Sequence, residues 1–349
     1  MFPTGNPVSA YLNTRVTLFS SRLWEAENFS KLIETPATEM AETLGARGLP
    51  QLAAGFDSLD NRSLEQRIIA QLLEETTVLI RPLTGAGRDF LIYWTERFEV
   101  SNLKTLLRGK MTGERPAELL NRLTPMGSFG RLDIQDLAHA EDVAELLRRL
   151  EAGPYAAIVR QARRAFEENH NPFILDAALD RSYYERLAQR AEPLEKTNGV
   201  AFRRLMGGLI DRINLVWLLR YRFNYNLPPS QVYFLLVGSH YSLTSTRLRE
   251  LAALPDLADI LDALPASLRT SMEGVTEIPQ VFTRMEHTAA TSAHKVLRSG
   301  APAIARAFAY LLLRERELRS VRAVLRGRLL DLPPADIRLA MYQSLSGNA

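Results

Sequence analysis

A short helical signature occurs three times in this 349-residue sequence, and it constrains the fold more than any other feature. The copies are Glu99–Lys110, Asp211–Arg222 and Glu317–Arg328. Each begins with an acid, has a small polar residue three places later, and ends with a Leu-Arg pair and a second base. The arginines of the Leu-Arg pairs are separated by 112 and 106 residues. This spacing is too long for a solenoid repeat and suits a duplicated domain.

The surroundings of the signature are repeated as well. Proline follows every copy, at Pro116, at Pro228 with Pro229, and at Pro333 with Pro334. A weaker pattern of leucines and acids recurs in Leu137–Leu150 and Leu251–Leu264, and in Leu32–Leu44 with one residue slipped. The repeated unit is therefore several helices long. We expect three similar helical domains, residues 1–115, 116–228 and 229–349.

Hydrophobic periodicity indicates the fold class. Leucines and other aliphatic residues recur at steps of three and four, most clearly in Leu64–Leu79, Arg203–Leu219 and Ala303–Leu330. This spacing is typical of helices that bury one face. Short alternating runs joined by Asn-Gly or Asp-Gly turns, which would indicate hairpins, are missing. The sequence predicts an all-α protein without flexible linkers.

Composition excludes several classes of protein. A hydrophobic content of 46% is enough for a large buried core. With no cysteine, the chain has no disulfide framework, no thiolate zinc site and no cysteine nucleophile. The N-terminal residues show no basic segment followed by an apolar one, so we expect no signal peptide and a cytoplasmic location.

Arginine dominates the basic residues. It supplies 38 of the 43 lysines and arginines. Because the planar guanidinium group favours bidentate and interfacial contacts, heavy use of arginine fits large polar interfaces. A general codon bias explains the same excess equally well.

Residues that could carry catalysis do not form a recognisable site. No Gly-x-x-x-x-Gly-Lys loop is present to bind phosphates. The five histidines lack the three or four converging ligands that zinc requires; they are His139, His170, His240, His287 and His294. We therefore expect no cofactor, metal or small-molecule substrate.

One acidic cluster invites an enzymatic interpretation. Asp256, Asp259 and Asp262 are spaced like the magnesium-binding aspartates of helical prenyl transferases. That chemistry needs a second acidic helix, which is absent here. Asp256 follows Pro255 and is better interpreted as a helix start, where its charge complements the helix dipole.

The repeated bases are the candidate site. The bases of the three copies are Arg108, Lys110, Arg220, Arg222, Arg326 and Arg328. Each arginine of a Leu-Arg pair could form an internal ion pair with another helix. Alternatively, threefold pseudo-symmetry could arrange the three arginines around a central hole that receives a partner. The sequence favours the internal role slightly, and leaves both open.

Four segments together carry a resemblance to a known family. They are Tyr11–Arg15, Asn102–Arg108, Ala178–Tyr184 and Asn214–Arg222. In these segments the sequence resembles the C subunit of bacterial and archaeal V/A-type ATPases, whose eukaryotic counterpart is the V-ATPase d subunit. The resemblance extends from about Tyr11 to Ile337, and the family's internal triplication agrees with the repeat. Trp24 and Ser320 depart from the family pattern.

The resemblance implies a structure and a set of partners. It implies three similar helical domains in a pseudo-threefold, funnel-shaped arrangement. The funnel sits peripherally on the cytoplasmic end of the proteolipid ring, receives the foot of the central stalk, and has the membrane stator subunit as a further neighbour. Such a subunit transmits rotation and catalyses no reaction.

The main alternative is a helical scaffold that binds nucleic acid through arginine. It predicts basic runs gathered on one face with aromatic residues between them. The segment Arg314–Arg328 partly qualifies, although Glu315 and Glu317 interrupt it.

Overall fold

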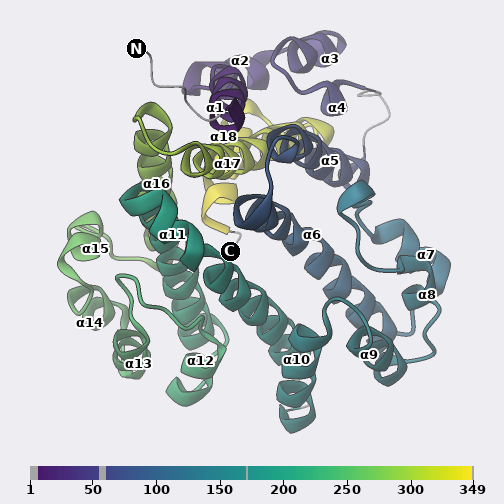
Figure 1. Ribbon diagram of the computed structural model, residues 1–349, viewed down its shortest axis with the longest axis vertical. Coiled ribbons are helices and arrows are strands. Elements are labelled where there is room, and N and C mark those ends of the chain that lie inside the picture. Colours follow the sequence, from purple (N-terminus) through teal and green to yellow (C-terminus); the bar gives the residue numbers. More distant parts are fainter. Residues whose placement is uncertain (1–6, 55–59, 170–171, 348–349) are drawn as a thin grey trace. The chain divides into compact units, whose positions relative to one another are not determined.

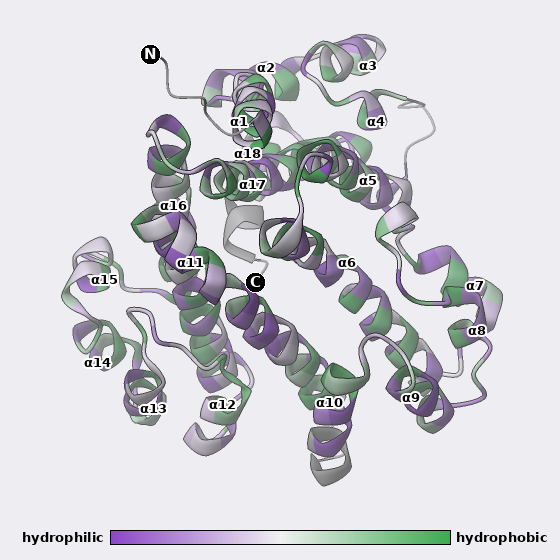
Figure 2. Cartoon of the chain, in the orientation of Figure 1, coloured by the Kyte–Doolittle hydropathy of each residue, from purple (hydrophilic) through white to green (hydrophobic). Residues whose placement is uncertain are grey.

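The computed structural model describes residues 7–54, 60–169 and 172–347. Within these ranges every regular element is a helix (Figure 1), which confirms the all-α prediction. Most helices carry both hydrophilic and hydrophobic residues (Figure 2), as partly buried helices do. None of the described helices is both long and apolar enough to cross a lipid bilayer.

The chain forms two compact units. The smaller unit comprises residues 89–190, and the larger unit comprises residues 1–88 and 191–349. Two long helices, α6 (Gly85–Met111) and α11 (Pro172–Leu219), contribute residues to both. α11 is interrupted at Gly199, whose φ of +63° is left-handed and favours glycine. The expected division into three domains stays a prediction.

The smaller unit is built around α6. Its other elements are α7 (Pro116–Arg122), the 3₁₀ turn η2 (Gly127–Phe129), α8 (Ile134–Ala138), α9 (Val143–Glu151), α10 (Ala156–Asn169) and the first part of α11. Asp142 caps α9 by accepting a hydrogen bond from the Glu145 N–H (2.8 Å). The helix then buries Leu146, Leu147 and Leu150 on one face.

The larger unit contains both ends of the chain. Its N-terminal elements are α1 (Pro7–Ser20), α2 (Ala26–Glu34), α3 (Ala37–Ala46), α4 (Pro50–Ala53) and α5 (Asn61–Ile80). The rest are the second part of α11, η3 (Arg220–Asn224), α12 (Pro229–Leu235), α13 (Ser245–Ala253), α14 (Leu257–Asp262), α15 (Ala266–Ser271), α16 (Ile278–Arg298), α17 (Ala303–Leu329) and α18 (Pro334–Gly347). α17 is the central helix, because α1, α2, α5, α16 and α18 all pack against it.

The three signature helices end in the same way. The terminating residues Gly113, Asn226 and Asp331 have left-handed backbones, with φ of +71°, +51° and +54°. The next N–H in each case returns to a carbonyl of the last turn: Glu114 to Gly109, Leu227 to Tyr221, and Leu332 to Gly327, all at 2.9 Å. In the first and third copies the bond spans five residues, which is the Schellman pattern of a helix C-terminus, and in the second copy it spans six. Proline then begins the next helix at Pro116, Pro229 and Pro334, where its missing N–H costs nothing.

The second copy differs at one position. Gly109 and Gly327 lie so close to the following helix that a Cβ would overlap Leu119 or Ile337. The corresponding residue of the second copy is Tyr221, and there the chain forms the π-helix η3, which holds one residue more before its left-handed terminus. The copy with the extra residue is therefore the same copy in which tyrosine replaces the close-contact glycine.

Candidate functional site: the repeated signature

The acid that begins each signature holds a separate segment of backbone. All three carboxylates are buried. Their backbone donors are Arg131 and Leu132 for Glu99 (2.8 and 2.9 Å), Ser242 and Leu243 for Asp211 (3.2 and 2.9 Å), and Trp24 for Glu317 (2.9 Å). These bonds satisfy N–H groups that would otherwise be buried without acceptors. The signature acid is therefore a clamp on a neighbouring loop.

The small polar residue forms a second clamp in two copies. Asn102 donates to the carbonyl oxygen of Thr124 and accepts from its N–H, both at 2.8 Å. Asn214 contacts Val237 in the same way, at 3.0 and 2.8 Å. Ser320 is too short for this two-point contact, and its hydroxyl donates to the Arg316 carbonyl of its own helix at 3.4 Å. The asparagine side chain thus binds both the N–H and the C=O of one residue, and the third copy lacks that interaction.

Replacing Asn214 tests the clamp. The side chain is 0% exposed, so Asn214→Ala leaves the N–H and C=O of Val237 buried without partners. We expect the free energy of unfolding to fall by about 2 to 4 kcal/mol, measured by urea denaturation. Asn224→Ala is the control, because Asn224 is exposed and a change of no more than about 0.5 kcal/mol is expected there. Equal effects of the two substitutions would contradict the clamp.

The second base of each signature donates to a backbone carbonyl. The bonds are Lys110 to Ala138 (2.7 Å), Arg222 to Leu227 (3.4 Å) and Leu254 (3.1 Å), and Arg328 to Thr35 (3.0 Å). In each copy the acceptor belongs to a different segment from the one held by the acid. The third copy takes both of its partner segments, at Trp24 and Thr35, from the N-terminal end of the chain.

The arginines of the Leu-Arg pairs have three different environments. Arg108 is exposed and pairs with Asp176 on α11, its Nε lying 2.7 Å from the carboxylate. Arg220 is half-buried with its guanidinium 5.2 Å from the centre of the Phe282 ring, and burial lowers its pKa. Arg326 is exposed, and its side chain makes no hydrogen bond or ion pair with any described residue. An internal ion pair therefore describes Arg108, and the partner-interface role of all six repeated bases stays a prediction.

Two buried ion clusters were not anticipated from the sequence. Glu286 on α16 accepts from Arg212 (2.6 Å) and Arg319 (2.9 Å), with Arg316 at 3.8 Å. Arg314 on α17 lies between Glu75 (2.7 Å) and Glu317, and also donates to the Gly48 carbonyl (2.9 Å). The Arg314–Glu317 pair has the spacing of three that brings residues together on a helix, which is the available sequence signal.

These clusters change the interpretation of the segment Arg314–Arg328. Arg314 is only 2% exposed, and Arg319 is engaged with Glu286. Arg322 donates to Glu65 at 2.8 Å, and Arg328 to Thr35. Most of the arginines that the nucleic-acid hypothesis places on one free face therefore serve internal contacts of the larger unit.

The remaining sequence candidates have ordinary structural environments. Asp256 is the N-cap of α14 and accepts from the Asp259 N–H at 2.9 Å, which confirms it as a helix start. His139 contacts the Gln135 carbonyl at 2.7 Å, and burial lowers the pKa of His294. His170 lies outside the described residues. Across residues 7–54, 60–169 and 172–347, no group of histidines and carboxylates is placed to hold a metal ion.

Comparison with known proteins identifies the family. The sequence profile of the ATP synthase (C/AC39) subunit family matches residues 12–339. The C subunit of the A-type ATP synthase from Methanothermobacter thermautotrophicus is 28% identical over 73% of this chain, a region that covers 65% of that protein. The proteins of the same name are 22% identical in Methanocaldococcus jannaschii (94% of this chain, 85% of that protein) and 26% identical in Haloferax volcanii (96% and 97%). The chain therefore belongs to the ATP synthase (C/AC39) subunit family, the family of the C subunits of A/V-type rotary ATPases.

Proposed function

We propose that this chain is a non-catalytic rotor subunit of a V/A-type ATPase. It couples the central stalk of the soluble ATPase sector to the proteolipid ring of the membrane sector during proton or sodium ion transport. The family match across residues 12–339 carries this proposal. The partners are the central-stalk subunits and the proteolipid ring, with the membrane stator subunit as a neighbour. The protein is peripheral, at the cytoplasmic face of the membrane.

Mechanical stiffness supports a coupling role. A part that transmits torque must resist bending, and close-packed helices deform little. The loops that connect the helices are tied to buried side chains, as Asp211 ties Leu243 and Asn214 ties Val237. A loop held at two backbone groups by a buried side chain has little freedom to slip. These ties favour a protein that turns as a stiff part.

The repeats suggest how such a protein is organised. The recurring helix C-terminus, acid clamp and second-base contact support the interpretation of residues 1–115, 116–228 and 229–349 as three related domains. In the proposed arrangement the domains surround a pseudo-threefold axis and form a funnel, with one end toward the stalk and the other toward the ring.

A pull-down from native membranes tests the assignment directly. The tagged, full-length chain is expected to retain nucleotide-binding subunits, stalk subunits and proteolipid together. In a filter-binding assay with generic DNA or RNA, we expect no retention above that of a neutral control protein. Recovery of nucleic acid without ATPase subunits would favour the scaffold alternative and overturn the proposal.

The repeated arginines provide a site-directed test. Combined Arg108→Ala, Arg220→Ala and Arg326→Ala substitution is expected to weaken binding of the isolated stalk subunits at least about tenfold, since arginine is frequent among interface residues that dominate affinity. Arg326 is exposed, so Arg326→Ala alone should change the free energy of unfolding by no more than about 0.5 kcal/mol. Parallel losses of stability and binding in the triple variant would instead assign the arginines to internal ion pairing.

A further inference from the structure

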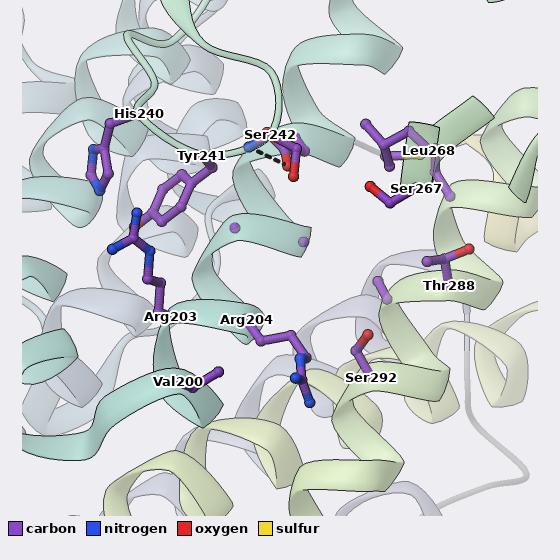
Figure 3. Close-up of a pocket in the computed structure, with 15 residues that line it drawn as sticks. Val200, Arg203, Arg204, His240, Tyr241, Ser242, Ser267, Leu268, Thr288 and Ser292 are labelled. Carbon is purple, nitrogen blue, oxygen red and sulfur yellow. Dashed lines mark hydrogen bonds between the residues drawn. The ribbon is translucent and has the colours of Figure 1, made fainter. Parts of the chain in front are cut away.

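A hollow of about 630 Å³ opens between the second part of α11, the loop before α13, α15 and α16, all within the larger unit. Figure 3 shows its labelled side chains arranged around an open centre. Its volume lies in the range of ligand-binding pockets. The signature contacts do not occupy it, although Asp211 lies in its wall. We refer to it as the α11–α16 hollow.

Two arginines of α11 line the α11–α16 hollow and point in different directions. Arg203 and Arg204 are consecutive and exposed, and neither forms an ion pair or hydrogen bond with a described residue. Consecutive helical residues point about 100° apart. Figure 3 shows the result: Arg203 extends along Tyr241 toward His240, while Arg204 extends toward Ser292. A single small anion would therefore not engage both guanidinium groups at once.

Hydroxyl groups without internal partners complete the polar lining. Thr288 and Ser292 lie one turn apart on α16, and Ser267 lies on α15. Hydroxyl groups in helices commonly donate to a carbonyl one turn back, as Thr283 of α16 does to Pro279 at 3.0 Å. None of the three makes a hydrogen bond with a described residue. Their donors are available to a ligand that brings acceptors.

The acid of the wall is already engaged, and so is a second acid that contacts the lining residues Tyr241 and His240. Both oxygens of Asp211 accept backbone N–H groups, from Ser242 and Leu243. Glu195 accepts from the Tyr241 hydroxyl and lies 3.8 Å from His240. The two arginines therefore retain positive charge that these acids do not pair.

Apolar side chains also line the hollow. Val200 is 71% exposed, and Leu268 and Met285 contribute to the lining. A Cβ added at Gly208 would meet no heavy atom within 4 Å, so the α11 surface is open there. The ligand that fits this lining has two separated anionic groups joined by an apolar part.

We propose that the α11–α16 hollow binds an acidic segment of a partner polypeptide. Two carboxylate side chains of the segment pair with Arg203 and Arg204, an apolar side chain between them covers the exposed Val200, and its backbone carbonyls accept from the free hydroxyls. A peptide suits the hollow because it spaces two carboxylates apart. This inference does not depend on which assembly the chain serves, so it can fail without the proposed function failing.

Fluorescence anisotropy with the full chain tests the proposal. The probe is a labelled peptide, Glu-Glu-Leu-Leu-Glu-Glu, and its counterpart is the same peptide with glutamine in place of every glutamate. At low salt, where charge pairing is strongest, we expect the acidic peptide to bind at least about tenfold more tightly than the glutamine peptide. Arg203→Gln with Arg204→Gln is expected to remove that difference.

Two further variants separate the hollow from general charge. Gly208→Leu places a side chain in the hollow at a position where an added Cβ meets no heavy atom, and leucine favours helix more than glycine does, so it should abolish binding without lowering the melting temperature. Arg47→Gln with Arg160→Gln removes the same charge from exposed arginines that do not line the hollow and should bind like the parent chain. Equal weakening by this control, or parent-like binding by Gly208→Leu, overturns the proposal. Binding of inorganic phosphate that Gly208→Leu abolishes, with no peptide binding, would also overturn it.

Discussion

Glu286→Gln is expected to lower the free energy of unfolding by about 3 to 5 kcal/mol. Glu286 is buried and is the carboxylate shared by Arg212, Arg316 and Arg319, which come from α11 and α17. Glutamine preserves the shape of the side chain but removes its charge, so three guanidinium groups lose the same counter-ion. Because breaking a buried ion pair leaves uncompensated charge, the effect greatly exceeds that of a surface pair. Urea denaturation at pH 7 measures it.

The pH dependence of this loss has a definite sign. Burial raises the pKa of Glu286, but the three arginines outweigh burial and hold the pKa below its usual value. The carboxylate therefore contributes stability above its unfolded pKa, and that contribution is lost as the pH falls through the lower, folded pKa. The difference between parent and variant should shrink in acid.

A matched substitution controls for the loss of one acid. Glu273 is exposed and its side chain forms no hydrogen bond or ion pair with a described residue, so Glu273→Gln should change stability by no more than about 0.5 kcal/mol. If Glu286→Gln were equally mild, the three arginines would not depend on the charge of Glu286, and the structural role assigned to Glu286 would be wrong.

Arg314→Met is expected to cost about 3 to 5 kcal/mol at pH 8 and clearly less at pH 5. Arg314 is 2% exposed and is the cation between the buried carboxylates of Glu75 and Glu317. Methionine fills much of the volume but leaves two negative charges in one buried site. At pH 5, below the raised pKa of Glu317, that carboxyl group is protonated, which relieves both the repulsion and the cost of burying its charge.

The titration of Glu317 sets the direction of this effect. Burial, with a smaller contribution from Glu75, raises the pKa of Glu317 to about 7 against the opposing effect of Arg314. The pKa of this carboxyl group is higher in the folded protein than in the unfolded chain. The free energy of unfolding therefore falls as the pH rises from the unfolded pKa toward 7. Removing Arg314 strengthens that trend, so the deficit of the variant should grow with pH.

An exposed ion pair on the same helix provides the comparison. Arg322 pairs with the partly exposed Glu65, and Arg322→Met should cost no more than about 1 kcal/mol. Denaturation curves of both variants at pH 5 and pH 8 check the prediction. A deficit for Arg314→Met that does not change with pH would show that protonation of Glu317 does not relieve the site.

Local sequence patterns predicted the parts of the structure that depend on residues close together in the sequence. Leucine spacing predicted the all-α fold, and Asp256 was correctly interpreted as the start of a helix. The resemblance in four short segments was confirmed by the family match over residues 12–339. These features are set within one or two helical turns, or within a contiguous pattern, and follow from the order of residues alone.

Contacts between distant residues could not be predicted in the same way. The sequence does not indicate that Glu317 meets Trp24, or that Arg108 meets Asp176, because the three-dimensional path of the chain decides both. Charged residues are mostly solvent-exposed in folded proteins, yet Arg314 and Glu286 are buried. Burial of charge depends on exact partners, and a single sequence does not name them.

The contacts of Glu317 with Trp24 and of Arg328 with Thr35 have a consequence for biosynthesis. The N-terminal helices lie in the structural neighbourhood of the third signature, and α1 and α2 pack against α17. The ribosome therefore makes the first helices long before their partner. At about 5 to 20 residues per second, the N-terminal segment waits roughly 15 to 60 s for α17 to emerge. During that interval the apolar face of α1 has to remain unaggregated, so the earliest residues of this protein are among the last to reach their final packing.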